Sequence, residues 1–119
     1  VLWISDLAFN QRTTFLGDGH SKQIILAQDW LLENFPKANL MVPGHGSAQT
    51  APLPMVSKTR DYIQRLRDAM AKAVDEGVDM YDAVHNVEFS DWKDTHLYEE
   101  NHRANANFVY REMEQALFE

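Results

Sequence analysis

The chain has 119 residues, of which 45% are hydrophobic and 24% charged, and a net charge of −7. These values are typical of one globular domain, and the acidic balance argues against binding to nucleic acids or anionic membrane surfaces. The chain has no cysteine, which excludes disulfides, thiolate metal sites and a cysteine nucleophile, so any metal site must use His, Asp and Glu. No apolar run approaches the roughly 20 residues that span a bilayer, and composition leaves the cellular compartment open.

The first predicted element is a strand over residues 1–7, where apolar residues on both faces indicate a central, buried position. The chain starts at Val1 rather than Met, directly in this run, so we expect it to be a piece of a longer protein. Asp6 falls at the carboxyl end of the strand, where a buried acidic side chain needs a partner. We expect Asp6 to be either a structural hydrogen-bond acceptor or a site residue.

A loop is expected over residues 8–21, with His20 as an ordinary loop histidine. Ser21 is expected to cap a helix over residues 22–35, where apolar residues recur at helical spacing until Pro36 stops it. A second strand follows this helix. The order strand, helix, strand predicts a βαβ unit with two parallel strands.

The second predicted strand, residues 39–42, ends in the turn Pro43-Gly44-His45-Gly46. A histidine held in a tight turn has a fixed ring with accessible nitrogens, which suits a metal ligand or a general base, and an incidental loop histidine is the alternative. Open α/β sheets place their sites at the carboxyl ends of the strands, so Asp6 and His45 are expected to lie together. A carboxylate and an imidazole are good zinc ligands, but a catalytic zinc normally has at least three protein ligands.

Three helices are predicted in the second part of the chain. A proline-containing linker is expected over residues 49–54, then a long helix over residues 55–76 that Gly77 closes. Its apolar stripe is predicted to consist of Tyr62, Leu66, Met70 and Ala73. Its basic residues are interspersed with acidic ones, so they are expected to form an exposed face and not a nucleic-acid patch. Asp79 is expected to cap a short helix that ends near Val87. Its inward-facing residues are predicted to be Tyr81, Val84 and His85.

The last predicted helix covers residues 96–117, with Thr95 as its cap. The Phe89 to Lys93 turn before it carries two aromatic residues that should pack onto the core. The apolar side of this last helix is predicted to carry Leu97, Ala104, Phe108 and Leu117, with Tyr98, Val109, Met113 and Ala116 nearby.

Glu99-x-x-His102 has the spacing that places two metal ligands on one helix face in di-iron bundles. Such sites need a second copy of the motif from a facing helix, and the sequence contains none. We interpret this segment as a solvated face on which His102 and Asn105 make hydrogen bonds.

A strand ending in Asp, a helix, and a strand ending in Val-Pro-Gly-His-Gly resemble the second half of a metallo-β-lactamase-fold hydrolase. That family usually has Gly-Asp, then a hydrophobic residue and Phe, and often an Arg. Here the sequence is Ser5-Asp6-Leu7-Ala8-Phe9-Asn10-Gln11-Arg12, with serine in place of the glycine. The tail, with its Phe-x-x-Trp turn and a helix with Tyr-x-x-x-His-x-x-Asn, is similar to the quinoprotein-relay or sulfur-oxidation-associated zinc hydrolases.

The resemblance implies an α/β fold, the C-terminal half of an αββα metallo-β-lactamase fold with few strands and about four helices. Residues 1–54 would form the strand–helix–strand part that carries the metal-ligand turn. Residues 55–119 would form a helical extension, and the two together one partial domain. Asp6 would be the aspartate that bridges two zinc ions, and His45 the last histidine ligand, on the second ion.

The principal metal motif of that family, His-x-His-x-Asp-His, and its intermediate histidine ligand are absent from this chain. Two zinc ions and hydrolysis of an acyl or related ester bond in a small-molecule substrate are therefore expected of an intact parent protein. This chain alone is expected to bind zinc weakly or not at all and to be inactive. The expected partners are the missing N-terminal half of the fold and further copies of the chain, because a strand edge and a sheet face would be uncovered.

The alternative hypothesis is a non-catalytic α/β or helical protein-interaction module. A His-x-His-x-Asp-His motif upstream of Val1 in the parent reading frame would favour the hydrolase, and Val1 as a true mature start would favour the module. The substrate, the compartment and the role of the helical tail stay open at this point.

Overall fold

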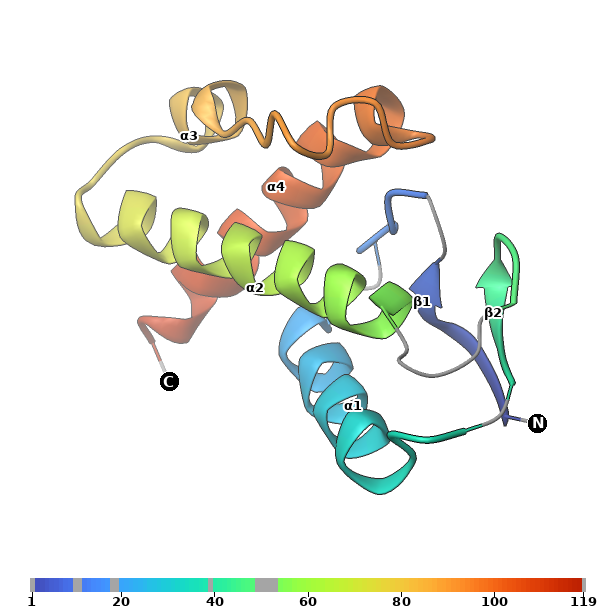
Figure 1. Ribbon diagram of the computed structural model, residues 1–119. Helices are drawn as coiled ribbons and strands as arrows, with labels where there is room; N and C mark the ends of the chain where they lie inside the picture. Colours follow the sequence, from blue (N-terminus) through green and yellow to red (C-terminus); the bar gives the residue numbers. More distant parts are fainter. Residues whose placement is uncertain (1, 10–11, 18–19, 39, 49–53, 119) are drawn as a thin grey trace.

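The structure is a computed structural model that describes residues 2–9, 12–17, 20–38, 40–48 and 54–118. Two strands and a helix lie on one side of the molecule, and three further helices extend from them (Figure 1). The elements in chain order are β1 (Leu2–Phe9), α1 (Ser21–Asn34), β2 (Met41–His45), α2 (Pro54–Asp75), α3 (Met80–Asn86) and α4 (Tyr98–Ala116). The predicted α/β class, with few strands and four helices among the described residues, is confirmed.

The strands β1 and β2 pair in parallel, as predicted from the order strand, helix, strand. The register runs from Leu2 opposite Met41 to Phe9 opposite His45, with two irregularities between. Both strands are longer than predicted, because β1 continues to Phe9 and β2 continues to His45. Asp6 therefore lies within β1 rather than at its end, and His45 is the last strand residue, so the sharp turn begins at Gly46 with φ of 88°.

One face of β1 is packed and the other carries an exposed tryptophan. Ile4 and Ala8 are buried, together with Met41 of β2, against α1 and the first residues of α2. Trp3, which alternation places on the opposite face, is 77% exposed. The prediction that this strand is buried on both faces is therefore wrong for Trp3.

The helical core forms where α2 crosses α4 (Figure 1). The predicted α2 stripe is confirmed, because Tyr62, Leu66 and Met70 are buried, and Ala73 is half-buried. The predicted apolar side of α4 is wrong: Leu117 is 64% exposed, and Ala104 and Phe108 are only half-buried. The buried residues of α4 are Tyr98, His102, Asn105, Ala106, Val109 and Tyr110.

Two of the predicted helix signals are confirmed. The Asp79 side chain accepts a hydrogen bond of 2.9 Å from the backbone N–H of Asp82 at the start of α3. Gly77 follows α2 with φ of 74°, a conformation that favours glycine. The predicted inward positions of Tyr81 and His85 are wrong, because both side chains are exposed and their rings stack at 4.0 Å between centroids.

The predicted caps of α1 and α4 are also wrong. His20 is the residue before α1, and it makes no side-chain cap hydrogen bond. The Ser21 hydroxyl instead donates to the Glu112 carboxylate of α4. At α4 the capping position is Leu97, with φ of 63°, rather than Thr95.

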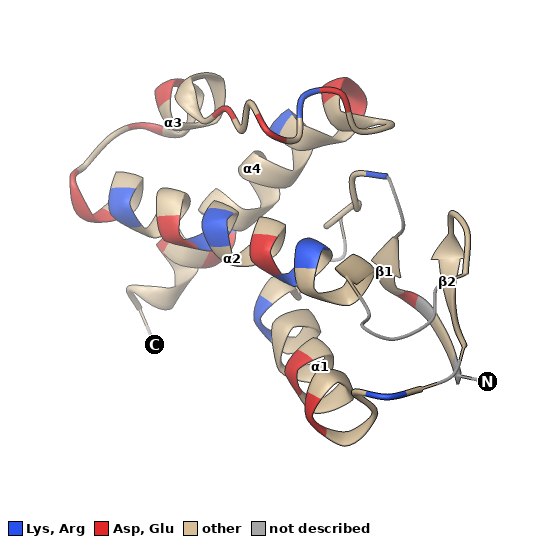
Figure 2. Cartoon of the chain, in the orientation of Figure 1, with Lys and Arg blue, Asp and Glu red and all other residues tan. Residues whose placement is uncertain are grey.

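The outer side of α2 carries charges of both signs, as Figure 2 shows. Arg60 pairs with Asp29 of α1, Arg65 with Asp91, and Arg67 with Glu112 of α4, the last at 3.2 Å. These pairs tie α2 to its neighbours and confirm that its arginines do not form a separate basic patch. The predicted linker over residues 49–54 lies outside the described residues except for Pro54, which starts α2. None of the described helices has the length and apolarity that crossing a membrane requires.

Candidate functional site

The parallel pairing of β1 and β2 brings Asp6 and His45 together at the edge of the sheet. The Nε2 atom of His45 lies 4.0 Å from the Oδ1 atom of Asp6. The His45 side chain is 48% exposed and that of Asp6 70% exposed, so a ligand can reach both. The two candidate metal ligands, which are 39 positions apart in sequence, therefore have neighbouring polar atoms.

Their separation suits a shared metal ion. Two ligands bound about 2.1 Å from a tetrahedral zinc ion lie roughly 3.4 Å apart, so the pair would close by about half an ångström on binding. Among the described residues, however, no group of three or more His, Cys, Asp or Glu side chains could hold a metal ion. Asp6 and His45 therefore fit zinc as two of its ligands, and a tetrahedral site would need further ligands from elsewhere.

Phe9 links this pair to a nearby cation. Its ring centroid lies 5.2 Å from that of His45, at an interplanar angle of 43°. On the same aromatic ring, the guanidinium carbon of Arg12 lies 5.6 Å from the centroid, within the range of a cation–π contact. Phe9 thus contacts both the His45 ring and the Arg12 guanidinium, which lie in the same site.

A cleft of about 570 Å³ opens over these residues. Such a volume is enough for a small molecule. Its polar lining comes from both parts of the chain: Asp6, Arg12, Thr13, Thr14, His45 and Asn101. Of these, Asn101 belongs to α4, so the helical tail contributes to the wall of the cleft.

The helix α4 and the segment before it also hold the loop that carries Arg12. Arg12 forms a parallel bridge with His96, and the N–H of Thr13 donates to the His96 carbonyl at 2.8 Å. The Asn101 amide donates to the Thr13 carbonyl at 3.3 Å. The helical tail, whose role the sequence left open, therefore holds the loop that forms one wall of the cleft.

Asn105 fixes the next part of the same loop from inside the protein. Its amide nitrogen donates to the Thr14 carbonyl at 2.7 Å, and its oxygen accepts from the N–H of Leu16 at 2.8 Å. Asn105 is fully buried. One asparagine side chain thereby satisfies two loop backbone groups that burial would otherwise leave unpaired.

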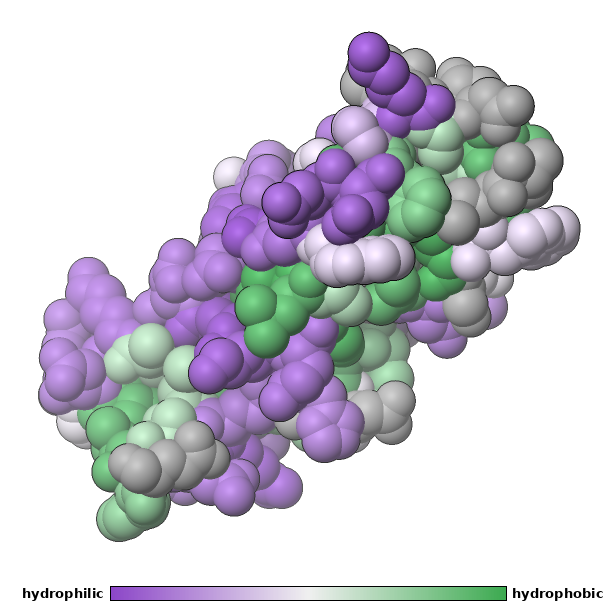
Figure 3. All heavy atoms as spheres, turned by 90° about the horizontal axis from the view of Figure 1, so that it is seen from below, coloured by the Kyte–Doolittle hydropathy of each residue, from purple (hydrophilic) through white to green (hydrophobic). Residues whose placement is uncertain are grey.

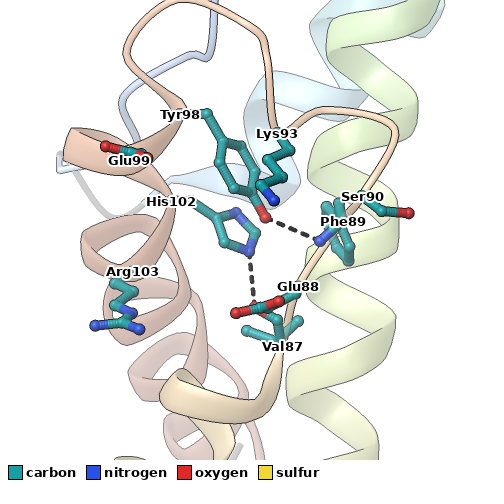
Figure 4. A pocket seen from close by; sticks show the side chains of 9 residues that line it. All are labelled: Val87, Glu88, Phe89, Ser90, Lys93, Tyr98, Glu99, His102 and Arg103. Atoms are coloured by element: carbon teal, nitrogen blue, oxygen red, sulfur yellow. Dashed lines mark hydrogen bonds between the residues drawn. The ribbon is translucent and has the colours of Figure 1, made fainter.

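A second histidine, His102, lies in a different setting, shown in Figure 4. The rings of Tyr98 and His102 face the segment that carries Val87, while Glu99 and Arg103 point away from the two rings. The two rings stack with 4.4 Å between centroids. A pocket of about 420 Å³ opens beside them.

Both ring nitrogens of His102 are occupied by hydrogen bonds. Because a carbonyl can only accept, Nε2 donates to the Val87 carbonyl at 3.0 Å. Nδ1 then accepts from the Tyr62 hydroxyl, whose oxygen is 2.7 Å away. That hydroxyl accepts in turn from the Asn105 amide at 3.2 Å. His102 has no free nitrogen for a metal or a substrate, so its role in this network is structural.

Burial shifts the pKa values of two side chains in this network. Desolvation lowers the pKa of His102, although the hydrogen bond to Val87 partly opposes the shift. Desolvation likewise raises the pKa of Tyr62, against the opposing effect of the hydrogen bond from Asn105. Both side chains are therefore held in their neutral forms at neutral pH.

The prediction of a solvated face at His102 and Asn105 is wrong, since they are 3% and 0% exposed. The prediction that they make hydrogen bonds is confirmed. The helical spacing Tyr98, His102, Asn105, Val109 was the signal available in the sequence. It was missed because polar residues normally mark an exposed face, whereas here each polar group has a buried partner.

The side chains of the remaining histidines line neither the cleft nor the buried network. His20, His85 and His96 are exposed, and His85 bonds through Nδ1 to the Tyr81 carbonyl at 2.8 Å. None of them lines the cleft that holds Asp6 and His45.

Searches against protein-family models and against curated proteins found no match to this chain.

Proposed function

We propose that this chain is the C-terminal part of a zinc-dependent hydrolase of the metallo-β-lactamase superfamily. Asp6 and His45 would supply two ligands of a dinuclear zinc site, as the sequence resemblance implies. The remaining ligands would come from an N-terminal half of the fold that this chain lacks. When bound, zinc would supply polarisation of an acyl or related ester bond in a small-molecule substrate.

The observation that carries the proposal is the 4.0 Å approach of His45 Nε2 to Asp6 Oδ1. The position of the pair on a parallel strand pair, where His45 ends β2 and both residues line a cleft, supports the same function. Among the described residues, no third His, Asp or Glu joins this pair, which supports the proposal that further ligands come from another part of the fold. With two ligands, the chain alone should bind zinc weakly and should not hydrolyse substrate.

The test is a zinc titration of the chain, followed by the ring resonances of its five histidines in NMR spectra. His45 should respond at lower zinc concentrations than His20, His85 or His96, and the affinity should be weaker than micromolar. Asp6→Asn should abolish this selectivity, because it removes the second ligand. Asp94→Asn, which removes the same charge from an exposed position outside the cleft, should leave it unchanged.

Two results would contradict the proposal. One is a response of His45 that does not precede that of the other exposed histidines, or that survives Asp6→Asn. The other is micromolar or tighter affinity in calorimetry, which would mean that the chain carries a complete site of its own.

A non-catalytic interaction module is the second candidate, and the apolar surface favours it. Exposed large hydrophobic side chains include Trp3 at 77%, Trp30 at 57% and Phe118 at 86%. Figure 3 shows hydrophobic side chains interrupting the hydrophilic surface on the face seen from below Figure 1. Apolar surface of this kind is typical of contact with another protein, which would be the missing half in the first proposal and a further copy of the chain in the second.

Light scattering distinguishes a chain that self-associates from one that stays monomeric. Self-association should raise the apparent mass as the concentration increases, and Trp3→Ser should weaken it if the exposed face of β1 is the contact. A clean monomer at high concentration would argue against self-association and would leave the missing half as the proposed partner.

A further inference from the structure

The helix α4 and the short helix α3 form a groove of about 430 Å³, separate from the cleft that holds Asp6 and His45. Its apolar lining residues are Val84, Ala104 and Phe108. Its other lining residues are basic or neutral polar ones: His85, Arg103, Asn107 and Arg111. Among the described residues no carboxylate lines this groove, although the chain has 18 acidic residues against 11 basic ones. The groove therefore suits an apolar side chain that is accompanied by a negative charge.

The arginines of this groove differ from those of α2 in how their charge is compensated. Arg60, Arg65 and Arg67 each pair with a carboxylate. Arg103 and Arg111 are exposed, and among the described residues neither has a carboxylate within ion-pair distance. The two lie about two turns apart on α4, so both can contact one partner that runs along the helix.

The carboxyl-terminal end of α4, near the chain end marked in Figure 1, has the opposite charge. Phe118 is 86% exposed, and Glu114, one turn before it, is also exposed. The backbone at Leu117 keeps helical angles, with φ of −64° and ψ of −20°, so this end continues the course of the helix. Ala104, Arg111 and Phe118 follow one another at a spacing close to two turns, and they therefore share one side of α4.

This side of α4 thus has two complementary parts, a basic and apolar groove and an acidic and apolar end. The two parts cannot meet within one copy, because the helix keeps them about 15–20 Å apart. Two copies related by a two-fold axis can place their α4 helices antiparallel, and each groove then faces the acidic end of the other copy. Such a contact is isologous, so every interaction in it forms twice.

We propose that α4 docks antiparallel against α4 of a second copy of this chain. Phe118 of each copy fills the groove of the other, beside Phe108, and Glu114 of each copy pairs with Arg111 of the other. Burial of the phenylalanine rings supplies most of the affinity, and the ion pairs set the antiparallel orientation. The contact covers only about 22 Å of helix, so the dissociation constant should be on the order of 100 μM. The self-contact then lies on α4 and not on the exposed face of β1.

Sedimentation equilibrium of the chain from about 10 μM to about 1 mM measures this dimer. Phe118→Ser should weaken association about tenfold or more, because each dimer loses two buried rings. Arg111→Glu and Glu114→Arg should each weaken it about fivefold or more, because each places like charges opposite one another. The double variant Arg111→Glu/Glu114→Arg should associate within about twofold of the wild type, since the exchange restores both ion pairs.

Leu26→Ser is the matched control for Phe118→Ser, because Leu26 is a 58% exposed apolar residue of α1 that does not line the groove. Trp3→Ser tests the exposed face of β1 as the alternative contact. Both variants should leave the dissociation constant unchanged. All the substituted side chains are exposed, so the variants should fold, and circular dichroism checks this.

A chain that stays monomeric at about 1 mM overturns the inference. So does a Phe118→Ser dimer as strong as that of the wild type, an equal loss with Leu26→Ser or Trp3→Ser, or a double charge exchange that does not restore association. These outcomes are separate from the proposed function, because neither Asp6 nor His45 lies in the contact. Zinc can select His45 in a monomeric chain, and two copies can pair through α4 without zinc.

Discussion

His45 and His102 show how differently one fold can use the same side chain. His45 ends a strand, is about half exposed, and has its Nε2 atom 4.0 Å from a single carboxylate oxygen. His102 lies in the middle of α4, is 3% exposed, and has both ring nitrogens engaged. The first is available for chemistry, and the second is committed to structure.

The difference lies in what each ring could still bind. A histidine can act as a ligand or a base only if one nitrogen lone pair is accessible. The lone pair of His102 is taken by the Tyr62 hydroxyl, and its N–H by the Val87 carbonyl. The local sequence around His102 contains a carboxylate at metal-ligand spacing, yet the contacts of the ring exclude that function. Spacing alone is therefore a poor guide to metal sites in helices.

The largest expected effect on stability comes from removing Asn105 from the buried network. Asn105→Ala should lower the free energy of unfolding by about 2–4 kcal/mol, because it leaves the Leu16 N–H and the Thr14 carbonyl without their partner. Urea denaturation followed by circular dichroism measures this loss.

Asn107→Ala is the control for that measurement, since Asn107 is a half-buried asparagine two positions further along α4. Its cost should be below about 1 kcal/mol. Equal costs for the two variants would mean that the loop is not held by Asn105.

The next effect is a pH dependence of stability. Burial lowers the pKa of His102 in the folded chain, so the unfolded chain takes up a proton first as the pH falls. The titration of His102 therefore costs no stability above the unfolded pKa of about 6.5. Below that pH, stability should fall by up to about 1.4 kcal/mol per pH unit until the folded pKa is reached.

Urea titrations of the wild type and His102→Gln between pH 4.5 and 7.5 isolate this contribution, because the carboxylates titrate in both proteins. The variant should be less stable at pH 7.5 and should show a shallower loss on acidification. His85→Gln, at an exposed position, should match the wild-type slope. Parallel slopes for His102→Gln and the wild type would rule out a neutral buried His102.

The smallest expected effect on stability is at the proposed metal ligand. His45→Ala should change the free energy of unfolding by less than about 0.5 kcal/mol, because the side chain is 48% exposed and lies at a strand end. The same variant should remove the selective zinc response of the chain. A loss of several kcal/mol in denaturation would instead place His45 with His102 as a structural residue.

The pattern of residues along the chain determined the elements and their order. Apolar runs, Pro36, Gly77 and the Asp79 cap are local signals, and each acts within a few residues of itself. For that reason the parallel strand pair, the α2 stripe and the start of α3 were predictable. The juxtaposition of Asp6 and His45 was predictable for the same reason, because it needs only the parallel pairing of two successive strands.

Only the tertiary structure decided which faces are buried and which polar groups are paired. Asn105 is buried because two loop backbone groups and the Tyr62 hydroxyl, all more than 40 positions away, meet it. The same long-range contacts place Asn101 and Arg12 beside the strand edge. Polarity predicts exposure only while no partner is in reach, and which partner is in reach depends on segments that are distant in sequence and adjacent in the fold.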